Sequence, residues 1–513
     1  MTSKESKVTN SITFDVIVVG AGPSGLMVSI KLKQLDSKLS ILVLEKASVI
    51  GGHSLSGAIL EINEQNESFI KSLELATNVK SDHVWYLTQS KHIDLSSLIP
   101  ANLSNINCMI IDLPELCTKM ADRAKSLGIE IIECCGVNDV IKDGTLVVGV
   151  ELTDGSRLFG KHVFLAEGAN GTVTTKLLNF HNNKIARSFA LGLKEEWELV
   201  TRNSVGNVYH TVGWPSTIHN SWGGGFIYFN KNVLSIGYVI HLDYKNAYIR
   251  PNDELNLLKA HPSIKGLLRG NIGKRIKYGA KLITLSSIGL STDACYSGCT
   301  VIGCAFGLVN TLRLKGLDMA LKSGCIAASN YISFLSKSNT MRTWLFPKLE
   351  ANLAWSRKVT AVMKKCGIVI GMIVKVISKP FVTKWFAKAS DNEMTFKASV
   401  CRPLRNWNQI DERIDSLNYS GNTYSNRSSH IMVYDKLAYK LYDLRTQDKL
   451  TSRLCPARVY EWLKINKHYS PIIRYENCLQ CKACCAKPIA GMITWNPSEN
   501  GGGPNYVSRN IIS

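Results

Sequence analysis

Residues 14–35, FDVIVVGAGPSGLMVSIKLKQL, carry the pattern that decides the fold. Val16–Val19 form a continuous apolar run, which is typical of a parallel strand buried on both faces. A glycine turn and a helix follow, and LSILVLEKA (39–47) supplies the next strand, which is expected to end at Glu45. The turn has the spacing G-x-G-x-x-G, at Gly20, Gly22 and Gly25. This order of elements predicts a dinucleotide-binding unit, the alternative being a glycine-rich turn of ordinary α/β packing.

Each part of the unit has a physical role. Gly20 permits the tight turn, Gly22 lets the backbone approach a pyrophosphate, and Gly25 lets the helix pack closely on the strand. The start of the helix offers free N–H groups and the positive end of its dipole to the phosphates. Glu45 accepts hydrogen bonds from ribose hydroxyls. The predicted cofactor-binding residues of this unit are Gly20, Gly22, Ser24, Gly25, Glu45 and Lys46.

Two later segments favour FAD over NAD as the dinucleotide. VFLAEGANG (163–171) and VIGCAFGLVN (301–310) each read as a strand that runs into a close backbone approach, and 314–332 reads as the helix after the second. Glycine-bearing strand ends so far apart in sequence predict a discontinuous FAD domain. The predicted cofactor-binding glycines of these segments are Gly168, Gly303 and Gly307.

The region between those segments has a different pattern. GNVYHTVGWP (206–215), GGGFIYFN (223–230) and VLSIGYVIHLD (233–243) are strand-like runs that predict an antiparallel sheet covering the flavin. The fold class is therefore predicted as α/β, or α+β over the whole chain. The predicted domains are FAD in 1–75, 105–185 and 291–335, a second domain in 186–290, a membrane-associated segment in 336–400, and a C-terminal iron–sulfur domain in 401–513.

Composition is that of a globular protein in a reducing compartment. The 513 residues are 45% hydrophobic and 20% charged, and the 15 cysteines do not form a secreted disulfide pattern. The net charge of +21 favours anionic partners, but the lysines are dispersed rather than gathered in a stripe with aromatic residues. A nucleic-acid partner is therefore not expected.

One segment suits a membrane surface. Residues 366–386 alternate apolar groups with lysines and end in Trp385 and Phe386, which predicts a stretch lying in the lipid interface. A buried helix with lysines reaching to the surface is the alternative. Residues 1–13 lack arginine and contain Glu5, unlike a mitochondrial transit peptide. We therefore expect a bacterial protein, or an already processed mature form.

ENCLQCKACCAKP (476–488) contains cysteines at every third position. Three thiolates on such a short loop suit three corners of a cubane cluster, and Cys455-Pro456 resembles the Cys-Pro that ends bacterial ferredoxin motifs. Cys485 is expected to point away from its neighbour. Structural zinc is the alternative. The predicted ligands of a [4Fe–4S] cluster are Cys455, Cys478, Cys481 and Cys484.

A series of motifs resembles the electron transfer flavoprotein–ubiquinone oxidoreductase family over nearly the whole chain. They occur in the family's order: GGHSLSGA (51–58), GLKEEW (192–197), HTVGWP (210–215), LDYKNAYIRP (242–251), HPSI (261–264), GKRIKYGA (273–280), MALKSG (319–324), CPARVYE (455–461), NCLQCKAC (477–484) and GGGPNY (501–506).

The resemblance implies three intertwined domains, for FAD, ubiquinone and iron–sulfur. It implies a peripheral protein on the cytoplasmic face of the bacterial inner membrane, or on the mitochondrial inner membrane in a processed form. It implies electron transfer flavoprotein as donor and ubiquinone as acceptor, with electrons passing through FAD and the cluster. The family's aromatic-Gly-Gly quinone turn matches Gly223 and Gly224, after Trp222. Gly57 is implied to bind FAD, and 366–386 matches a membrane-facing stretch. The rival reading is a flavoprotein of the same superfamily that reduces a polyprenyl lipid.

The chain departs from the family at several positions. Ala305-Phe306 replaces a Ser-Pro pair, and Leu317–Met319 replaces threonine and histidine positions, so a hydroxyl donor to the flavin ring is expected to be missing. Near the cluster, Arg458 replaces glycine and Cys485 replaces aspartate.

Overall fold

The computed structural model describes most of the chain. The described residues are 13–55, 58–64, 66–180, 188–219, 221–285, 295–311, 313, 315–337, 353, 355–357, 359, 360, 363, 413–424, 430–441, 443, 449–465, 468–487 and 492–507. The predicted cofactor residue Gly57 and the predicted membrane segment 366–386 lie outside this set.

The first sheet contains the strand predicted from Val16–Val19. Within the described residues it has eight strands, in the order β17-β18-β11-β1-β2-β8, with β10 and β9 added beside β11. Its strands are β1 (Thr13–Val19), β2 (Ile41–Leu44), β8 (Glu130–Ile132), β9 (Val137–Asp143), β10 (Leu146–Leu152), β11 (Arg157–Leu165), β17 (Cys295–Tyr296) and β18 (Cys299–Val301). β1 runs parallel to both β2 and β11, which explains why its apolar run is buried.

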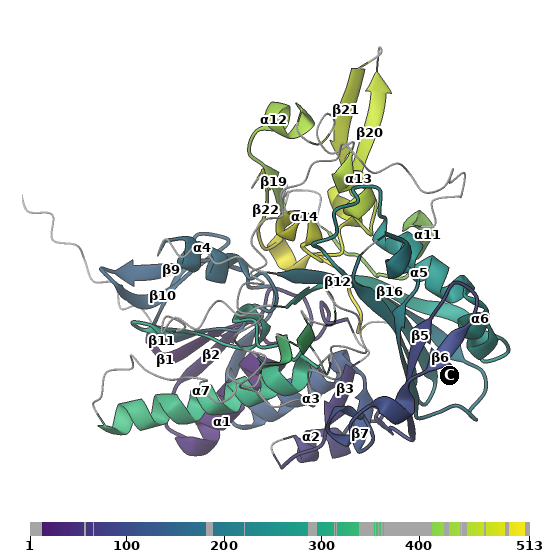
Figure 1. Ribbon diagram of the computed structural model, residues 1–513. Coiled ribbons are helices and arrows are strands. Elements are labelled where there is room, and N and C mark those ends of the chain that lie inside the picture. The colour runs from purple at the N-terminus through teal and green to yellow at the C-terminus, as the bar shows by residue number, and fades with distance from the viewer. Residues whose placement is uncertain are drawn as a thin grey trace, which may run out of the picture.

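Helices cover this sheet. They are α1 (Pro23–Leu35), α3 (Leu113–Ser126), α4 (Thr172–Phe180) and α7 (Leu317–Lys337). α1 contacts both α3 and α7, and Figure 1 shows these three helices on one side of the sheet. The helix predicted at 314–332 is therefore present as α7, and it packs on the helix of the dinucleotide unit.

The second sheet is mainly antiparallel, as predicted. Within the described part of the chain it has seven strands in the order β16-β12-β15-β14-β13-β5-β6, and α5 contacts β12 and β15. Its elements are β5 (Ser81–Leu87), β6 (His92–Asp94), β12 (Phe189–Leu199), β13 (Asn207–Gly213), β14 (Gly223–Phe229), β15 (Val233–His241), β16 (Ile272–Thr284), α5 (Pro251–Ala260) and α6 (Pro262–Leu268). β5 comes from a segment assigned to no domain above, and it pairs with β13 in parallel.

Smaller elements complete the fold. A three-stranded sheet joins β3 (Ala58–Glu61), β7 (Cys108–Ile111) and β4 (Thr77–Asn78), next to α2 (Glu67–Lys71). Short 3-10 turns are η1 (Ser96–Leu98), η2 (Ala101–Leu103), η3 (Ser216–His219), η4 (Gly303–Ala305), η7 (Tyr475–Asn477) and η8 (Glu499–Gly501). The C-terminal elements are α11 (Arg413–Leu417), β19 (Ile431–Val433), α12 (Lys436–Leu441), α13 (Leu450–Leu454), β20 (Tyr460–Ile465), β21 (His468–Ile473), α14 (Ala483–Ala486) and β22 (Ile493–Trp495).

The C-terminal elements do not form a separate core. Buried residues of the second sheet, such as Tyr238 and Tyr278, belong to the same apolar cluster as Cys455, Leu479 and Trp495. Figure 1 shows the C-terminal elements, in yellow, above the junction of the two sheets. The fold therefore fixes the cysteine loop against both the dinucleotide unit and the second sheet.

Candidate cofactor and redox site

The glycine turn has the geometry that a pyrophosphate needs. Gly20 has φ +104°, and a Cβ there would lie 2.7 Å from the carbonyl oxygen of Ala166. A Cβ on Gly25 would lie 2.0 Å from the Gly20 oxygen, so α1 can pack this closely only with glycine. A Cβ on Gly22 would meet nothing within 4 Å, and Gly22 caps α1 without a side-chain hydrogen bond. The turn therefore presents open backbone at a helix N-terminus.

Glu45 follows β2 and braces this turn. Its carboxylate accepts hydrogen bonds from the backbone N–H groups of Ala21 and Ala47, each at 2.9 Å. A carboxylate oxygen has two lone pairs, so both oxygens retain capacity for ribose hydroxyls. The predicted role of Glu45 fits this geometry.

One cavity of about 600 Å³ joins the predicted sites. It extends from the glycine turn to the start of β14, and the cysteine loop reaches it through Lys482. The predicted residues that line it are Gly20, Gly22, Ser24, Glu45, Lys46, Gly168, Gly223 and Gly224. Gly25, Gly303 and Gly307 are outside its described lining; a Cβ on Gly303 would lie 2.9 Å from the Ser24 side chain, so its role is one of packing behind the turn.

Three lysines line the cavity where the first sheet meets the cysteine loop. Lys46 Nζ lies 3.0 Å from His53 Nδ1 and donates to the side-chain oxygen of Gln480. Lys281 donates to the His53 carbonyl at 3.3 Å. Burial and the charges of Lys281 and Lys482 lower the pKa of Lys46, and burial lowers the pKa of Lys482 to about 8. Amino groups crowded in this way favour an anionic ligand, and only Lys46 was predicted from the sequence.

The glycines of β14 are required by the sheet itself. A Cβ on Gly224 would lie 2.2 Å from the Thr211 carbonyl oxygen, and a Cβ on Gly223 would lie 2.5 Å from that of Val239. These contacts leave no room for a side chain, while both residues line the cavity. At Gly223 and Gly224 the backbone rather than a side chain therefore faces the cavity, as the resemblance implies for a quinone site.

Three of the predicted cluster ligands, Cys455, Cys478 and Cys481, are buried in one apolar cluster, and Cys484 packs against that cluster. Cys455 ends α13, Cys478 follows η7, and Cys484 lies in α14. Burial raises the pKa of Cys478, and nearby negative charge on Cys484 and Cys455 raises it further. Burial likewise raises the pKa of Cys481, as does negative charge on the other three cysteines. Within the described residues, no three His, Cys, Asp or Glu side chains gather closely enough to hold one metal ion, as the zinc alternative requires.

Backbone donors already face these sulfurs. Val459 N–H donates to Cys455 Sγ at 3.4 Å, and Gln480 N–H donates to Cys478 Sγ at 3.3 Å. Such hydrogen bonds stabilise thiolates and tune cluster potentials. Cys455, Cys478 and Cys481 are buried and Cys484 is half-buried, and with N–H donors to two of the sulfurs this donor set fits a [4Fe–4S] cluster. The prediction that Cys485 points away is wrong, because its Sγ lies 3.9 Å from Cys484 Sγ.

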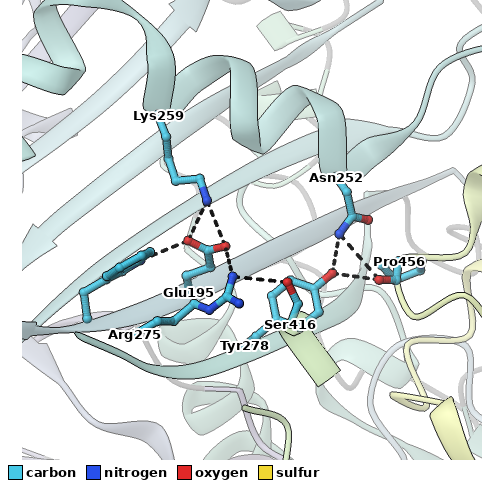
Figure 2. Close-up of polar contacts among 8 residues, drawn as sticks. Glu195, Asn252, Lys259, Arg275, Tyr278, Ser416 and Pro456 are labelled. Carbon is cyan, nitrogen blue, oxygen red and sulfur yellow. Dashed lines mark hydrogen bonds and ion pairs between the residues drawn. The ribbon is translucent and has the colours of Figure 1, made fainter. Parts of the chain in front are cut away.

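A polar network connects the second sheet to Pro456, the residue after Cys455 (Figure 2). The hydroxyl of Tyr278 donates to the carbonyl of Pro456 at 2.9 Å, beside Cys455. Asn252 donates to the same hydroxyl at 2.6 Å. Close by, Glu195 binds both Lys259 and Arg275, at 3.0 and 3.1 Å. Glu195, Tyr278 and Pro456 each lie in a motif quoted above, but the sequence does not show that these motifs meet, because they are far apart in the chain.

Family models match three parts of the chain. One described as "ETF-QO, ubiquinone-binding" matches residues 189–283, and one described as "Electron transfer flavoprotein-ubiquinone oxidoreductase, 4Fe-4S" matches residues 410–507. An NAD(P)-binding Rossmann-like domain matches residues 18–74.

Curated relatives match nearly the whole chain. The mitochondrial electron transfer flavoprotein-ubiquinone oxidoreductase of Oryza sativa subsp. japonica is 30% identical, over 97% of this chain and 93% of the relative. The chain belongs to the electron transfer flavoprotein–ubiquinone oxidoreductase family. The Homo sapiens member is also 30% identical, over 96% of this chain and 88% of its own length. The predicted family, fold class and cofactors, FAD and [4Fe–4S], are thereby confirmed.

Solved structures resemble this family member in fold alone. A geranylgeranyl bacteriochlorophyll reductase-like protein from Thermoplasma acidophilum superposes with a TM-score of 0.55 at 18% identity, over 73% of this chain and 98% of that protein. A flavin-dependent brominase gives 0.51 at 18% identity, over 71% and 90%. In the described part of this oxidoreductase, every helix is too short or too polar to cross a membrane.

Proposed function

We propose that this chain accepts electrons from reduced electron transfer flavoprotein and passes them to ubiquinone, with FAD and a [4Fe–4S] cluster as its electron carriers. The observation that carries the proposal is the single cavity of about 600 Å³. The dinucleotide turn, β14 and the cysteine loop all contribute to its lining, through Gly22, Gly224 and Lys482. One enclosure therefore borders the proposed site of each carrier and of the quinone.

The residues of this chain hold the two carriers against each other. When bound, FAD exchanges two electrons and a [4Fe–4S] cluster carries one at a time, so that together they connect single-electron delivery to a two-electron acceptor. Lys46, at the end of the dinucleotide unit, donates to Gln480, which lies between Cys478 and Cys481. Gln480 in turn donates to the Gly502 carbonyl, so the loop cannot shift without breaking both contacts.

Proposed roles for the site residues follow the predictions. The Gly20–Gly25 turn would hold the pyrophosphate, Glu45 the ribose, and the Gly223–Gly224 backbone the quinone carbonyl. The cluster would be held by Cys455, Cys478, Cys481 and Cys484. We place the protein on the surface of a respiratory inner membrane, with 366–386 in the lipid interface. The relatives' "mitochondrial" names and the apolar–lysine pattern of that segment support this placement.

Anaerobic spectroscopy and turnover test the proposal together. Dithionite-reduced protein should give the EPR signal of a [4Fe–4S]⁺ cluster, and acid should release FAD. Reduced electron transfer flavoprotein should then drive reduction of ubiquinone-1. Protein without iron, or with both carriers but no ubiquinone-1 reduction, would overturn it. Cys481→Ser separates the lipid-reductase rival, because a polyprenyl reductase would keep its turnover without the cluster.

A further inference from the structure

Three polar side chains form a row across the face of the second sheet. Asp82 is on β5, His210 on β13 and Tyr228 on β14. His210 Nε2 lies 3.0 Å from the Tyr228 hydroxyl, and His210 Nδ1 lies 3.8 Å from Asp82 Oδ1. Val208 pairs with both Asp82 and Tyr228, and His210 is two residues further along β13, so all three side chains lie on one face.

The surroundings of the row shift the pKa values of Asp82 and Tyr228. Burial would raise the pKa of Asp82, but the nearby His210 and hydrogen bonds from Asn105 lower it below its usual value. Asn105 donates to the Asp82 carboxylate through its backbone N–H at 2.7 Å and through its side-chain amide. The carboxylate is thereby fixed beside Nδ1 of His210, and Nε2 of the same ring faces the Tyr228 hydroxyl. Burial raises the pKa of Tyr228 well above its usual value, so its hydroxyl keeps its proton.

The row opens on the cavity. His210 and Tyr228 line it together with Gly223 and Gly224. His210 pairs with Phe226, which is two residues from Gly224 on the same face of β14, a separation of about 7 Å along the strand. The other titratable groups of the lining are Glu45, Lys46, His53, Cys135, Glu167, Lys194, His241, Lys281, Cys304 and Lys482.

Packing alone does not explain the row. Tyr228 lies in a small apolar cluster with Ile59, Val79, Cys108 and Ile110, where aliphatic side chains would pack as well. Placing a carboxylate and an imidazole beside such a cluster costs desolvation energy, which a well-packed apolar replacement avoids. The sheet face therefore carries an ionisable pair that its stability does not require.

We propose that Asp82, His210 and Tyr228 form a proton relay to the quinone, an inference that rests on the proposed function. Reduction of a quinone to a quinol takes two electrons, which the family's activity supplies, and two protons. The Tyr228 O–H bond breaks as a new O–H bond forms on a quinone oxygen, and Nε2 of protonated His210 returns a proton to Tyr228. Water reloads His210 for the second proton, while Asp82 stays ionised as a positioning residue.

Two acceptors separate proton delivery from electron flow. Ubiquinone-1 needs protons, whereas ferricyanide accepts one electron and none. Tyr228→Phe and His210→Gln should each lower the ubiquinone-1 rate by about 10²-fold, the usual contribution of a positioned acid, and leave the ferricyanide rate within about twofold. Asp82→Asn should give a smaller loss, and the variants should change the solvent deuterium isotope effect on quinone reduction.

A matched control is Tyr238→Phe on the neighbouring strand β15. It removes a hydroxyl that is hydrogen-bonded to Ser216 in η3, and Tyr238 is outside the described lining of the cavity. It should retain both rates. Unchanged quinone rates in Tyr228→Phe and His210→Gln, or equal losses with both acceptors, would overturn the relay. Failure of the proposed function would appear differently, as wild-type protein that reduces ferricyanide but not ubiquinone-1.

Discussion

The substitution Tyr278→Phe, which removes one oxygen atom, tests the contact between the second sheet and Pro456. Tyr278 is 1% exposed, and its hydroxyl donates to the Pro456 carbonyl while accepting from Asn252 (Figure 2). Phenylalanine keeps the ring packing and removes both bonds. Because Pro456 follows Cys455, the change frees the backbone next to a proposed cluster ligand.

The size of the effect follows from these contacts. Each buried hydrogen bond contributes roughly 1 kcal/mol net, and a buried carbonyl left without a good partner costs roughly 1–3 kcal/mol. Only the long 3.5 Å contact from Asn252 remains for the Pro456 oxygen. The expected loss of stability is therefore about 2–4 kcal/mol. If a loss of about 2 kcal/mol lowers the activation free energy of cluster release by the same amount, the cluster is released about 30-fold faster.

The assay is the rate of cluster loss in dilute guanidinium under anaerobic conditions, followed by visible absorbance and EPR. Tyr506→Phe is the control, because within the described residues its buried hydroxyl has no hydrogen-bond partner. That variant should release its cluster at the wild-type rate. Equal rates for Tyr278→Phe and wild type would refute the reasoning, as would an equal acceleration in the control.

Three further predictions concern the dinucleotide turn, the cluster and acid stability. Gly25→Ala places a Cβ 2.0 Å from the Gly20 oxygen and should abolish FAD retention, measured by acid-released flavin fluorescence, whereas Gly266→Ala, which meets nothing within 4 Å, should retain FAD. Cys481→Ser should remove the cluster EPR signal and keep the FAD content; a persisting signal would contradict its role as a ligand. Burial lowers the pKa of His162 from 6.5 to about 3, so the unfolded chain binds a proton here before the folded protein does, and stability is lost as the pH falls below 6.5. The loss due to His162 at pH 5 is about 2 kcal/mol, so in urea unfolding His162→Gln should lose about that much less than wild type between pH 7 and pH 5, and parallel pH dependences would contradict it.

The dinucleotide unit was predictable because its signals are local. β1 ends at Val19, α1 begins at Pro23 and Glu45 follows β2, all within one short stretch where apolar runs and glycine spacing determine the structure. The second sheet was only partly predictable. β5 joins it by parallel pairing with β13, more than a hundred residues away, and a polar strand such as SDHVWYL gives no signal of its partner.

The same distinction applies to the site. The cysteine spacing is local and could be recognised, whereas the meeting of Lys46, Lys281 and Lys482 depends on three elements that only the fold brings together. The row of Asp82, His210 and Tyr228 could not be found either, since it requires the register of β5, β13 and β14. Cys485 was misjudged because alternation holds for strands, while residues 483–486 form a helical turn.

The departures from the family are accommodated by specific contacts. Ala305 and Phe306, which replace the Ser-Pro pair, are each 3% exposed and pack in the core of the first sheet. Asp318, in the first turn of α7, accepts from the Glu61 N–H at 3.1 Å.

Arg458, three residues after the proposed ligand Cys455, is another departure that is accommodated by a specific contact. It has φ +52°, a left-handed conformation that explains why glycine suits this position and that costs roughly 1–2 kcal/mol for another residue. Its guanidinium lies 2.8 Å from Glu461, which also binds Arg474 at 2.7 Å. Arg458 therefore takes the glycine position at a cost in backbone strain, and its ion pair with Glu461 holds the side chain in place. For the changes near the proposed flavin site, at Ala305, Phe306 and Leu317–Met319, we expect any effect to appear in the ubiquinone-1 rate rather than in the FAD content.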